Sequence, residues 1–255
     1  MALLKRCALL LVLMVFLLIG SGALLTSVIR PLPGSPPETV MKVPVETVAH
    51  LRQIHEVLAG VVAVLALGLA IAASAGKDQP SVQSAAWLAA GLVLADAGLT
   101  GILHAVLAPF VFSSVVAVAV LTSKRSQEPP RQVPGLAVWV PMVLVLQIIL
   151  GAGFRHDILG VIWHILNAMV VMVLILVLGV RVLRKYPGHP TLRPAALSLL
   201  IVTGVQVLLG FAVYVTLILV SENNLALTVT SAVHVLTGSL TLAASVVLTL
   251  QLRCL

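Results

Sequence analysis

The sequence predicts an all-α membrane protein with eight transmembrane helices, arranged as two pseudo-repeated four-helix bundles. Three observations carry this prediction: the composition, a series of long apolar runs and a motif that recurs along the chain. Of the 255 residues, 60% are hydrophobic and 9% are charged, and the mean hydropathy is +1.18. Such values lie far outside the range of soluble domains. The lipid bilayer is therefore the first partner that the chain implies.

Runs of about 17–25 apolar residues are long enough to cross a bilayer as helices. The chain has eight of them, at 7–29, 47–74, 82–99, 101–122, 135–153, 158–180, 195–219 and 226–252. None alternates in polarity as the strands of a membrane barrel do. The first run follows two basic residues and contains small residues near its end, which also fits a signal peptide. Because it continues to Ile29, we interpret it as a retained helix.

Basic residues distinguish the two sides of the membrane. Eleven fall in one set of loops, namely Lys5, Arg6, Lys77, Lys124, Arg125, Arg131, Arg181, Arg184, Lys185, Arg193 and Arg253, and four in the other, Arg30, Lys42, Arg52 and Arg155. This bias in short loops predicts that both termini are cytoplasmic. It also accounts for the net charge of +7 without nucleic acid as a partner. Cys7 and Cys254 lie near the same reducing side and are predicted to be unpaired.

A polar linker, "TSKRSQEPPRQVPG" from Thr122 to Gly135, divides the chain into halves at 1–125 and 126–255. Weak self-similarity indicates a duplication, since "LQIILGAG" from Leu146 and "VQVLLGFA" from Val205 share a glutamine followed four residues later by glycine. In "LADAGLTG", Asp96 falls at the place of the glutamine. Four-helix bundles can hold a cofactor between their helices.

Four histidines recur near the start of the even-numbered runs, in "HEVLAG", "HAVLAP", "HILNAM" and "HVLTGS". They are His55, His104, His164 and His234, and the residues four places later are Ala59, Ala108, Ala168 and Gly238. Positions i and i+4 lie on the same face of a helix. Each imidazole therefore has a small residue one turn away, which leaves room for a flat ligand.

The four histidines are also predicted to lie at a similar depth. They precede Lys77, Lys124, Arg181 and Arg253 by 22, 20, 17 and 19 residues, respectively. At 1.5 Å per residue the spread is about 7 Å, which puts all four in the outer part of the bilayer. A rival alignment sets Ser113 against His164 and leaves His104 in a turn. We favour His104, in which case Pro109 lies inside the helix and kinks it.

Intramembrane imidazoles are functional candidates because an unpartnered polar ring is costly in lipid. Haem iron accepts two axial histidines from opposite faces, so the sequence predicts the metal ligand pairs His55 with His104 and His164 with His234. A zinc site requires three or four converging ligands, and single buried histidines are often merely hydrogen-bonded. Arg155, in "FRHDI", suits a haem propionate or an interfacial turn.

The eight helices, the histidine on each even helix, and "LQIILGAGFRHD" followed by "WHILNAM" resemble the haem A synthase family over essentially the whole chain. This resemblance implies oxidation of the C8 methyl group of haem O to a formyl group, in the plasma membrane of a prokaryote. It implies that His164 and His234 bind haem b, while His55 and His104 face the iron of the substrate haem O. Expected partners are an unidentified electron donor and haem O synthase, and a homo-oligomer is compatible with the sequence.

Two positions depart from the family pattern. Many members have a glutamate three residues before the first histidine, where this chain has Arg52, and Glu56 follows His55 instead. We therefore predict Glu56 as the catalytic acid, together with His55 and His104, and Arg52 as a contact to the first haem. The first outer loop also lacks the cysteine pair of many members. The alternatives are a non-catalytic b-type cytochrome or haem-handling protein and, less well matched to the uncharged midplane, a small transporter.

Overall fold

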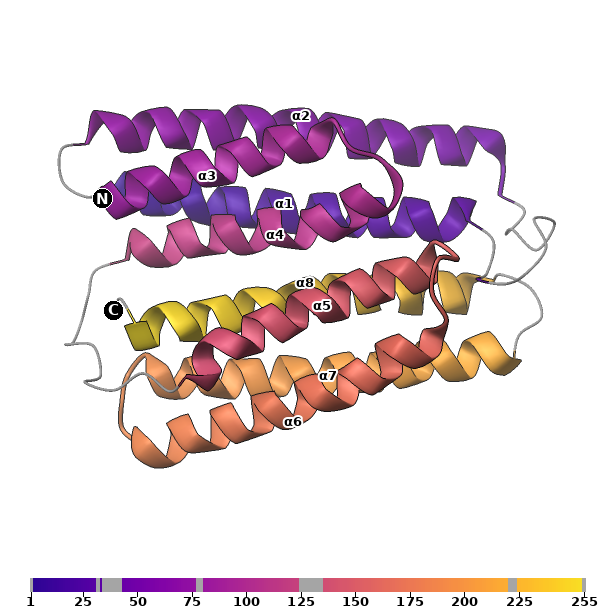
Figure 1. Cartoon of the computed structure of the whole chain (residues 1–255). Helices are drawn as coiled ribbons and strands as arrows, with labels where there is room; N and C mark the ends of the chain where they lie inside the picture. Colours follow the sequence, from indigo (N-terminus) through magenta and orange to yellow (C-terminus); the bar gives the residue numbers. More distant parts are fainter. Residues whose placement is uncertain are drawn as a thin grey trace.

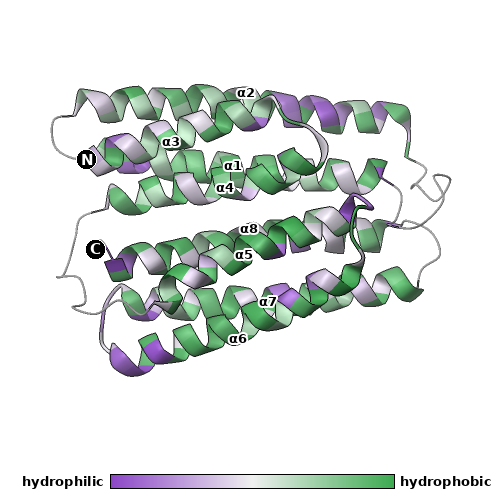
Figure 2. Cartoon of the chain, viewed as in Figure 1, coloured by the Kyte–Doolittle hydropathy of each residue, from purple (hydrophilic) through white to green (hydrophobic). Residues whose placement is uncertain are grey.

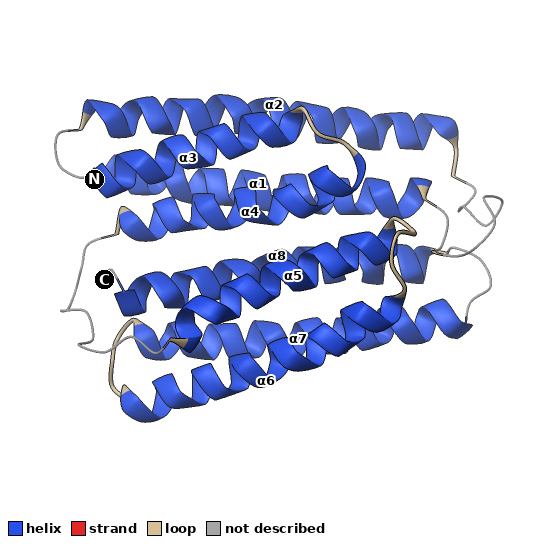
Figure 3. Cartoon of the chain, in the orientation of Figure 1, coloured by secondary structure: helices blue, strands red, loops and turns tan. Residues whose placement is uncertain are grey.

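The computed structural model describes residues 2–30, 33, 43–76, 80–123, 135–219 and 224–253. Within these residues the chain forms eight helices and no strand (Figure 3). They are α1 (Ala2–Ile29), α2 (Val45–Ala75), α3 (Pro80–Ala97), α4 (Gly101–Leu121), α5 (Leu136–Arg155), α6 (Val161–Lys185), α7 (Leu192–Leu219) and α8 (Leu225–Arg253). Each predicted apolar run overlaps one helix, because a helix satisfies every backbone hydrogen bond within the segment, as lipid requires.

Seven of the eight helices are long and apolar enough to cross a membrane, the exception being α3. This helix has 18 residues and carries polar side chains at both ends, including Ser81, Gln83 and Asp96. The structure thus supports a multi-pass, all-α membrane protein but not, by length and composition alone, all eight predicted crossings.

The outward faces of the helices are apolar. Leu13 on α1, Ile54 on α2, and Trp163 and Met169 on α6 are each at least half exposed. In Figure 2 hydrophobic colour runs along most of every helix, and hydrophilic colour gathers at places such as one end of α6. Exposed apolar surface of this extent is unfavourable in water but is the natural covering of a protein in lipid.

The helices pack as two groups of four that meet through α8. In the first group α1 and α3 each contact α2 and α4, and in the second α5 and α7 each contact α6 and α8. Between the groups, α8 contacts α1 and α4, and α4 contacts α5. Figure 1 shows the helices side by side, with the beginning of α1 and the end of α8 at the same end of the molecule.

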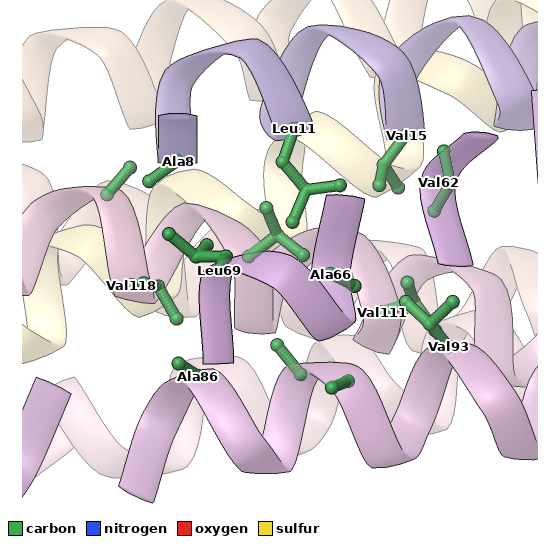
Figure 4. Packing of buried hydrophobic residues seen from close by; sticks show 14 of the residues in the cluster. Ala8, Leu11, Val15, Val62, Ala66, Leu69, Ala86, Val93, Val111 and Val118 are labelled. Atoms are coloured by element: carbon green, nitrogen blue, oxygen red, sulfur yellow. The ribbon is translucent and has the colours of Figure 1, made fainter. Parts of the chain in front are cut away.

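Each group has its own apolar core. Figure 4 shows part of the first, where Leu11 and Val15 of α1 lie near Val62 and Ala66 of α2 and Val93 of α3. The second core is formed by residues of α5 to α8, among them Ile175, Leu178 and Leu199, which are fully buried. On α8, Leu242 belongs to the second core and Ala243 to the first, so this helix joins the two.

Some predicted features lie outside the described residues. They are the basic residues Lys42, Lys77, Lys124, Arg125 and Arg131, most of the linker with the boundary between 125 and 126, and Cys254. The depth comparison for α2 and α4 and the position of the domain boundary therefore remain predictions. Pro109 lies inside α4, at the place that the sequence analysis expected.

Candidate functional site

The four repeated histidines form two pairs in the structure. The ring centres of His55 and His104 are 6.0 Å apart with their planes at 86°, and those of His164 and His234 are 6.2 Å apart with their planes at 78°. We call the first pair, between α2 and α4, the N-terminal centre, and the second, between α6 and α8, the C-terminal centre. The structure thus brings together the same residues that the sequence paired.

Both spacings match two imidazoles bound to one metal ion. A coordinated imidazole nitrogen lies about 2 Å from its metal. The centre of the ring lies about 1 Å further along the same line, so two rings on opposite sides of one iron have centres about 6 Å apart. Among the described residues, no group of three or more His, Cys, Asp or Glu side chains is arranged to hold a metal ion. Each centre offers two imidazoles, the number of axial ligands that haem iron accepts.

Hydrogen-bond partners on the preceding helix determine which ring nitrogen is protonated. The hydroxyl of Ser21 on α1 donates to the carbonyl of Leu18 at 2.8 Å, so its oxygen is left to accept from Nδ1 of His55 at 3.0 Å. Nδ1 of His104 lies 3.3 Å from the carbonyl oxygen of Asp96 and 3.1 Å from its Oδ1. Because these partners are acceptors, Nδ1 carries the proton and Nε2 keeps its lone pair for a metal.

In the C-terminal centre the partners are glutamines, and their amides lie close to Nε2 of both rings. Nδ1 of His164 donates to the carbonyl oxygen of Gln147 at 3.2 Å, and the amide of Gln147 lies 3.2 Å from Nε2. Asn167 donates to Oε1 of Gln147 at 2.7 Å and so orients that amide. The amide of Gln206 lies 3.3 Å from Nε2 of His234. An amide nitrogen can only donate, so Nε2 of His234 is an acceptor. For His164 the amide of Gln147 also lies 3.1 Å from Nδ1, so the proton is assigned to Nδ1 by the carbonyl oxygen of Gln147, which can only accept.

Two buried polar atoms of the C-terminal centre lack a hydrogen-bond partner in the described part of the chain. They are Nδ1 of His234 and Oε1 of Gln206. An unsatisfied buried polar atom destabilises a fold by about 1–3 kcal/mol. Groups kept at such a cost are candidates for a functional role.

Glycines on the odd-numbered helices make room for three of the rings. A Cβ atom on Gly22 of α1 would lie 2.8 Å from Cε1 of His55, one on Gly151 of α5 would lie 2.8 Å from Cε1 of His164, and one on Gly210 of α7 would lie 3.0 Å from Cε1 of His234. Real Cβ contacts are essentially never below 3.0 Å, and a contact at 3.0 Å is tighter than nine in ten of them. Any larger residue would push the ring aside.

The glycines and glutamines give the repeated motif a physical meaning. Gln147 and Gly151, like Gln206 and Gly210, contact the histidine of the next helix from positions one turn apart. Asp96 contacts His104, in agreement with its alignment to the glutamines. Sequence reasoning identified this motif only as a sign of duplication and missed Ser21 and Gly22, which belong to no such motif.

A short turn between α3 and α4 brings Asp96 to His104. The turn consists of residues 98–100, and Gly101 then begins α4 with a φ of 63°, a value that glycine adopts without strain. The backbone carbonyl of Asp96 accepts from the N–H of Leu99 at 3.1 Å as well as facing Nδ1 of His104. Ser113 instead lies buried further along α4 and donates to the carbonyl of Pro109. The geometry therefore supports His104 rather than Ser113 at this centre.

The small residues one turn after the histidines are half-buried in all four helices. At one of them the space is already in use, since a Cβ atom on Gly238 would lie 3.1 Å from Nε2 of Gln206. The expectation of a bare patch beside every histidine is thus too simple for His234. There the small residue accommodates the glutamine that contacts the ring.

The outer charged residues are placed less uniformly. Arg52 and Glu56 are exposed on α2, near His55 in sequence. Arg155 is half-buried at the end of α5, and its Nη2 donates to the carbonyl of Thr26 on α1 at 3.2 Å. It therefore connects the two helix groups at the C-terminal ends of α1 and α5. The roles of Arg52, Glu56 and Arg155 toward a haem remain predictions.

The turn after α5 contains a histidine with a perturbed pKa. Burial, together with the positive charges of Arg30 and Arg155, lowers the pKa of His156 below its usual value of 6.5. The unfolded chain then binds a proton more readily than the folded one, so acid destabilises the folded state as the pH falls through 6.5. We expect the melting temperature of His156→Gln to fall less than that of the wild type between about pH 7.5 and 5. An equal fall in the two proteins would contradict this.

No protein-family model matches the sequence, and a search of curated proteins finds none that is significantly similar.

Proposed function

We propose that this chain is an integral membrane haem protein of the haem A synthase type, with one haem site at each histidine pair. The observation that carries the proposal is the presence of two imidazole pairs with centres 6.0 and 6.2 Å apart. Acceptor partners leave the lone pair on Nε2 of His55, His104 and His164, and glycines leave room for three of the rings. In the C-terminal centre the amides of Gln147 and Gln206 lie 3.2 and 3.3 Å from Nε2 and have to turn aside for a metal. These features together suit axial ligation of two haems.

The two centres have different roles in this proposal. His164 and His234 hold haem b, which supplies one-electron redox capacity when bound, and His55 and His104 hold the substrate haem O. The side chain of His104 is 36% exposed, which favours a substrate that enters and leaves. Arg155 and Arg52 are proposed to contact propionates, and Glu56 to exchange protons with the substrate.

The proposed reaction converts the C8 methyl group of haem O to a formyl group through two hydroxylations. Each consumes one dioxygen, two protons and two electrons from the donor, inserts one oxygen atom into a C–H bond and releases one water. The resulting geminal diol loses a further water to leave the formyl group. An external reductant, whose identity stays open, therefore supplies four electrons for each haem A formed.

The proposal also includes the placement in the membrane. We take α3 as an eighth crossing, because it connects two helices that are themselves long enough to cross and contacts both. Lys5, Arg6, Arg181 and Arg253 lie toward the end of the bundle that carries both termini, which favours a cytoplasmic position for that end. The membrane is then the plasma membrane of a prokaryote, with haem O synthase as the source of substrate.

The activity is tested by expressing the chain in cells that make haem O, extracting the pigments and separating them by chromatography. We expect haem A or its hydroxylated precursor in amounts that depend on the intact chain. The matched control is His55→Ala, which keeps the C-terminal centre and is expected to yield neither product. Bound haem without either product, after prolonged incubation with a reductant, would refute the synthase activity.

A second function is favoured by one observation. Glu56, which we predict to replace the family glutamate, is exposed on α2, while Arg52 occupies the usual position of that glutamate. If the acid does not reach the substrate, the same scaffold is a non-catalytic b-type cytochrome or haem-handling protein. The pigment experiment separates the two, since the cytochrome contains haem B and forms no oxidised product.

A further inference from the structure

The two centres differ in the charge of the group beside one ring. In the N-terminal centre the carboxylate of Asp96 lies 3.1 Å from Nδ1 of His104. In the C-terminal centre the corresponding positions are the neutral amides of Gln147 and Gln206. We propose that Asp96 is a positioning residue that makes His104 the more electron-donating ligand and so holds the reduction potential of the N-terminal haem below the value it would otherwise have. This inference rests on the proposed function, which puts a haem iron at His104.

The surroundings of Asp96 keep its carboxylate beside the ring of His104. It is 8% exposed, at the last turn of α3, and Oδ1 has no aligned hydrogen-bond donor in the described part of the chain. Nδ1 of His104 lies nearest to Oδ1 but is aligned for a hydrogen bond with the backbone carbonyl of the same residue, at 3.3 Å. The N–H group therefore donates to the backbone carbonyl of Asp96, while the carboxylate of the same residue lies 3.1 Å from Nδ1 as a neighbouring negative charge.

A carboxylate beside Nδ1 changes the electronic properties of the ligand. It attracts the Nδ1 proton more strongly than an amide or a backbone carbonyl does, and the effect is enlarged in a low-dielectric interior. Electron density then shifts toward Nε2, which makes the imidazole a stronger donor to the metal. Ferric iron carries one more positive charge than ferrous iron and gains more from this donation. The oxidised form is stabilised and the reduction potential falls.

The contrast with the C-terminal centre gives the inference its direction. The polar partners of His164 and His234 are amide and carbonyl groups without formal charge. Glu56 adds a second negative charge near the N-terminal centre, but it is exposed, so solvent screens it. The charge in contact with a ring is therefore that of Asp96.

The test is a redox titration of Asp96→Asn, followed by absorbance, in a His164→Ala background in which only the N-terminal centre retains haem. We expect the equilibrium preference for ferric over ferrous haem to fall at least tenfold. For a one-electron couple this corresponds to a rise in the reduction potential of about 59 mV. Glu46→Gln is the charge-matched control, since this exposed acid lies nine residues before His55 on α2. It is expected to leave the potential unchanged.

Asp96→Glu keeps the carboxylate and separates an electronic role from a structural one. We expect it to bind haem with a potential close to that of the parent, even if Asp96→Asn binds haem too weakly to titrate. An unchanged potential in Asp96→Asn, or a potential raised equally in Asp96→Glu, would overturn the inference. The proposed function itself would be wrong if substitution of His55 in the His164→Ala protein removed no bound haem.

Discussion

Replacing either His164 or His234 by alanine is expected to abolish the low-spin absorbance of the C-terminal centre and to leave that of the N-terminal centre intact. The two rings have centres 6.2 Å apart, and in the proposed function each supplies one axial ligand. Loss of one ring leaves the iron with a single strong axial ligand. It also leaves the polar group that contacted the lost ring buried without a partner. The change is followed by absorbance spectra of the purified, haem-loaded variants.

His50→Ala serves as the matched control, because His50 is exposed on α2 and belongs to neither pair. Its spectrum is expected to equal that of the wild type. The reciprocal variants His55→Ala and His104→Ala are expected to remove only the N-terminal signal. Retention of the C-terminal spectrum in either His164→Ala or His234→Ala would show that this pairing is wrong.

The second large effect is expected from a single methyl group. In Gly151→Ala the new Cβ atom would lie 2.8 Å from Cε1 and 3.0 Å from Nδ1 of His164. The ring is held by Gln147, so it cannot move away without losing hydrogen bonds. Overpacking of this kind costs about 1–3 kcal/mol. If this cost opposes the ring orientation that binds haem, haem affinity drops roughly 10- to 100-fold.

Haem titration of the purified variant measures this loss. The control is Gly204→Ala on α7, where an added Cβ meets no atom within 4 Å. That substitution is expected to leave haem affinity unchanged and to stabilise the helix slightly, since alanine favours helix over glycine. On α1, Gly22→Ala and its neighbour Gly20→Ala form a second such pair for the N-terminal centre, with the nearest contacts at 2.8 and 3.9 Å. Equal affinities in Gly151→Ala and Gly204→Ala would mean that the ring is not confined as described.

The helices were predictable because a membrane permits few backbone conformations. Apolar runs of sufficient length identify α1, α2 and α4 to α8 directly, and the turn residues between them delimit the helices. Helix α3 was also found, but its crossing of the membrane is less well supported, because Gln83 and Asp96 lower its hydropathy. Helix formation and membrane crossing are separate properties. The hydropathy of a helix bears only on whether it crosses the membrane, so α3 forms a helix although its hydropathy gives less support for a crossing.

The histidine pairs were predictable from a repeat, whereas their surroundings were not. A histidine at a fixed place on each even helix indicates a shared centre whatever the rotation of the helices. The partners Ser21 and Gly22 depend on how α1 is rotated against α2, which no local pattern encodes. Glu56 illustrates the same limit: one residue along a helix turns a side chain by about 100°, and Glu56 is exposed although its neighbour His55 is directed inward to His104.

The central claim, that each histidine pair holds one iron between its rings, is tested most directly by low-temperature electron paramagnetic resonance of the oxidised, haem-loaded wild type. Imidazole planes at 86° and 78° are close to perpendicular, and perpendicular axial rings make the ferric low-spin signal strongly anisotropic. We expect such low-spin signals from both centres. A haem-loaded protein whose ferric iron is entirely high-spin, with no signal from two axial imidazoles, would contradict the claim.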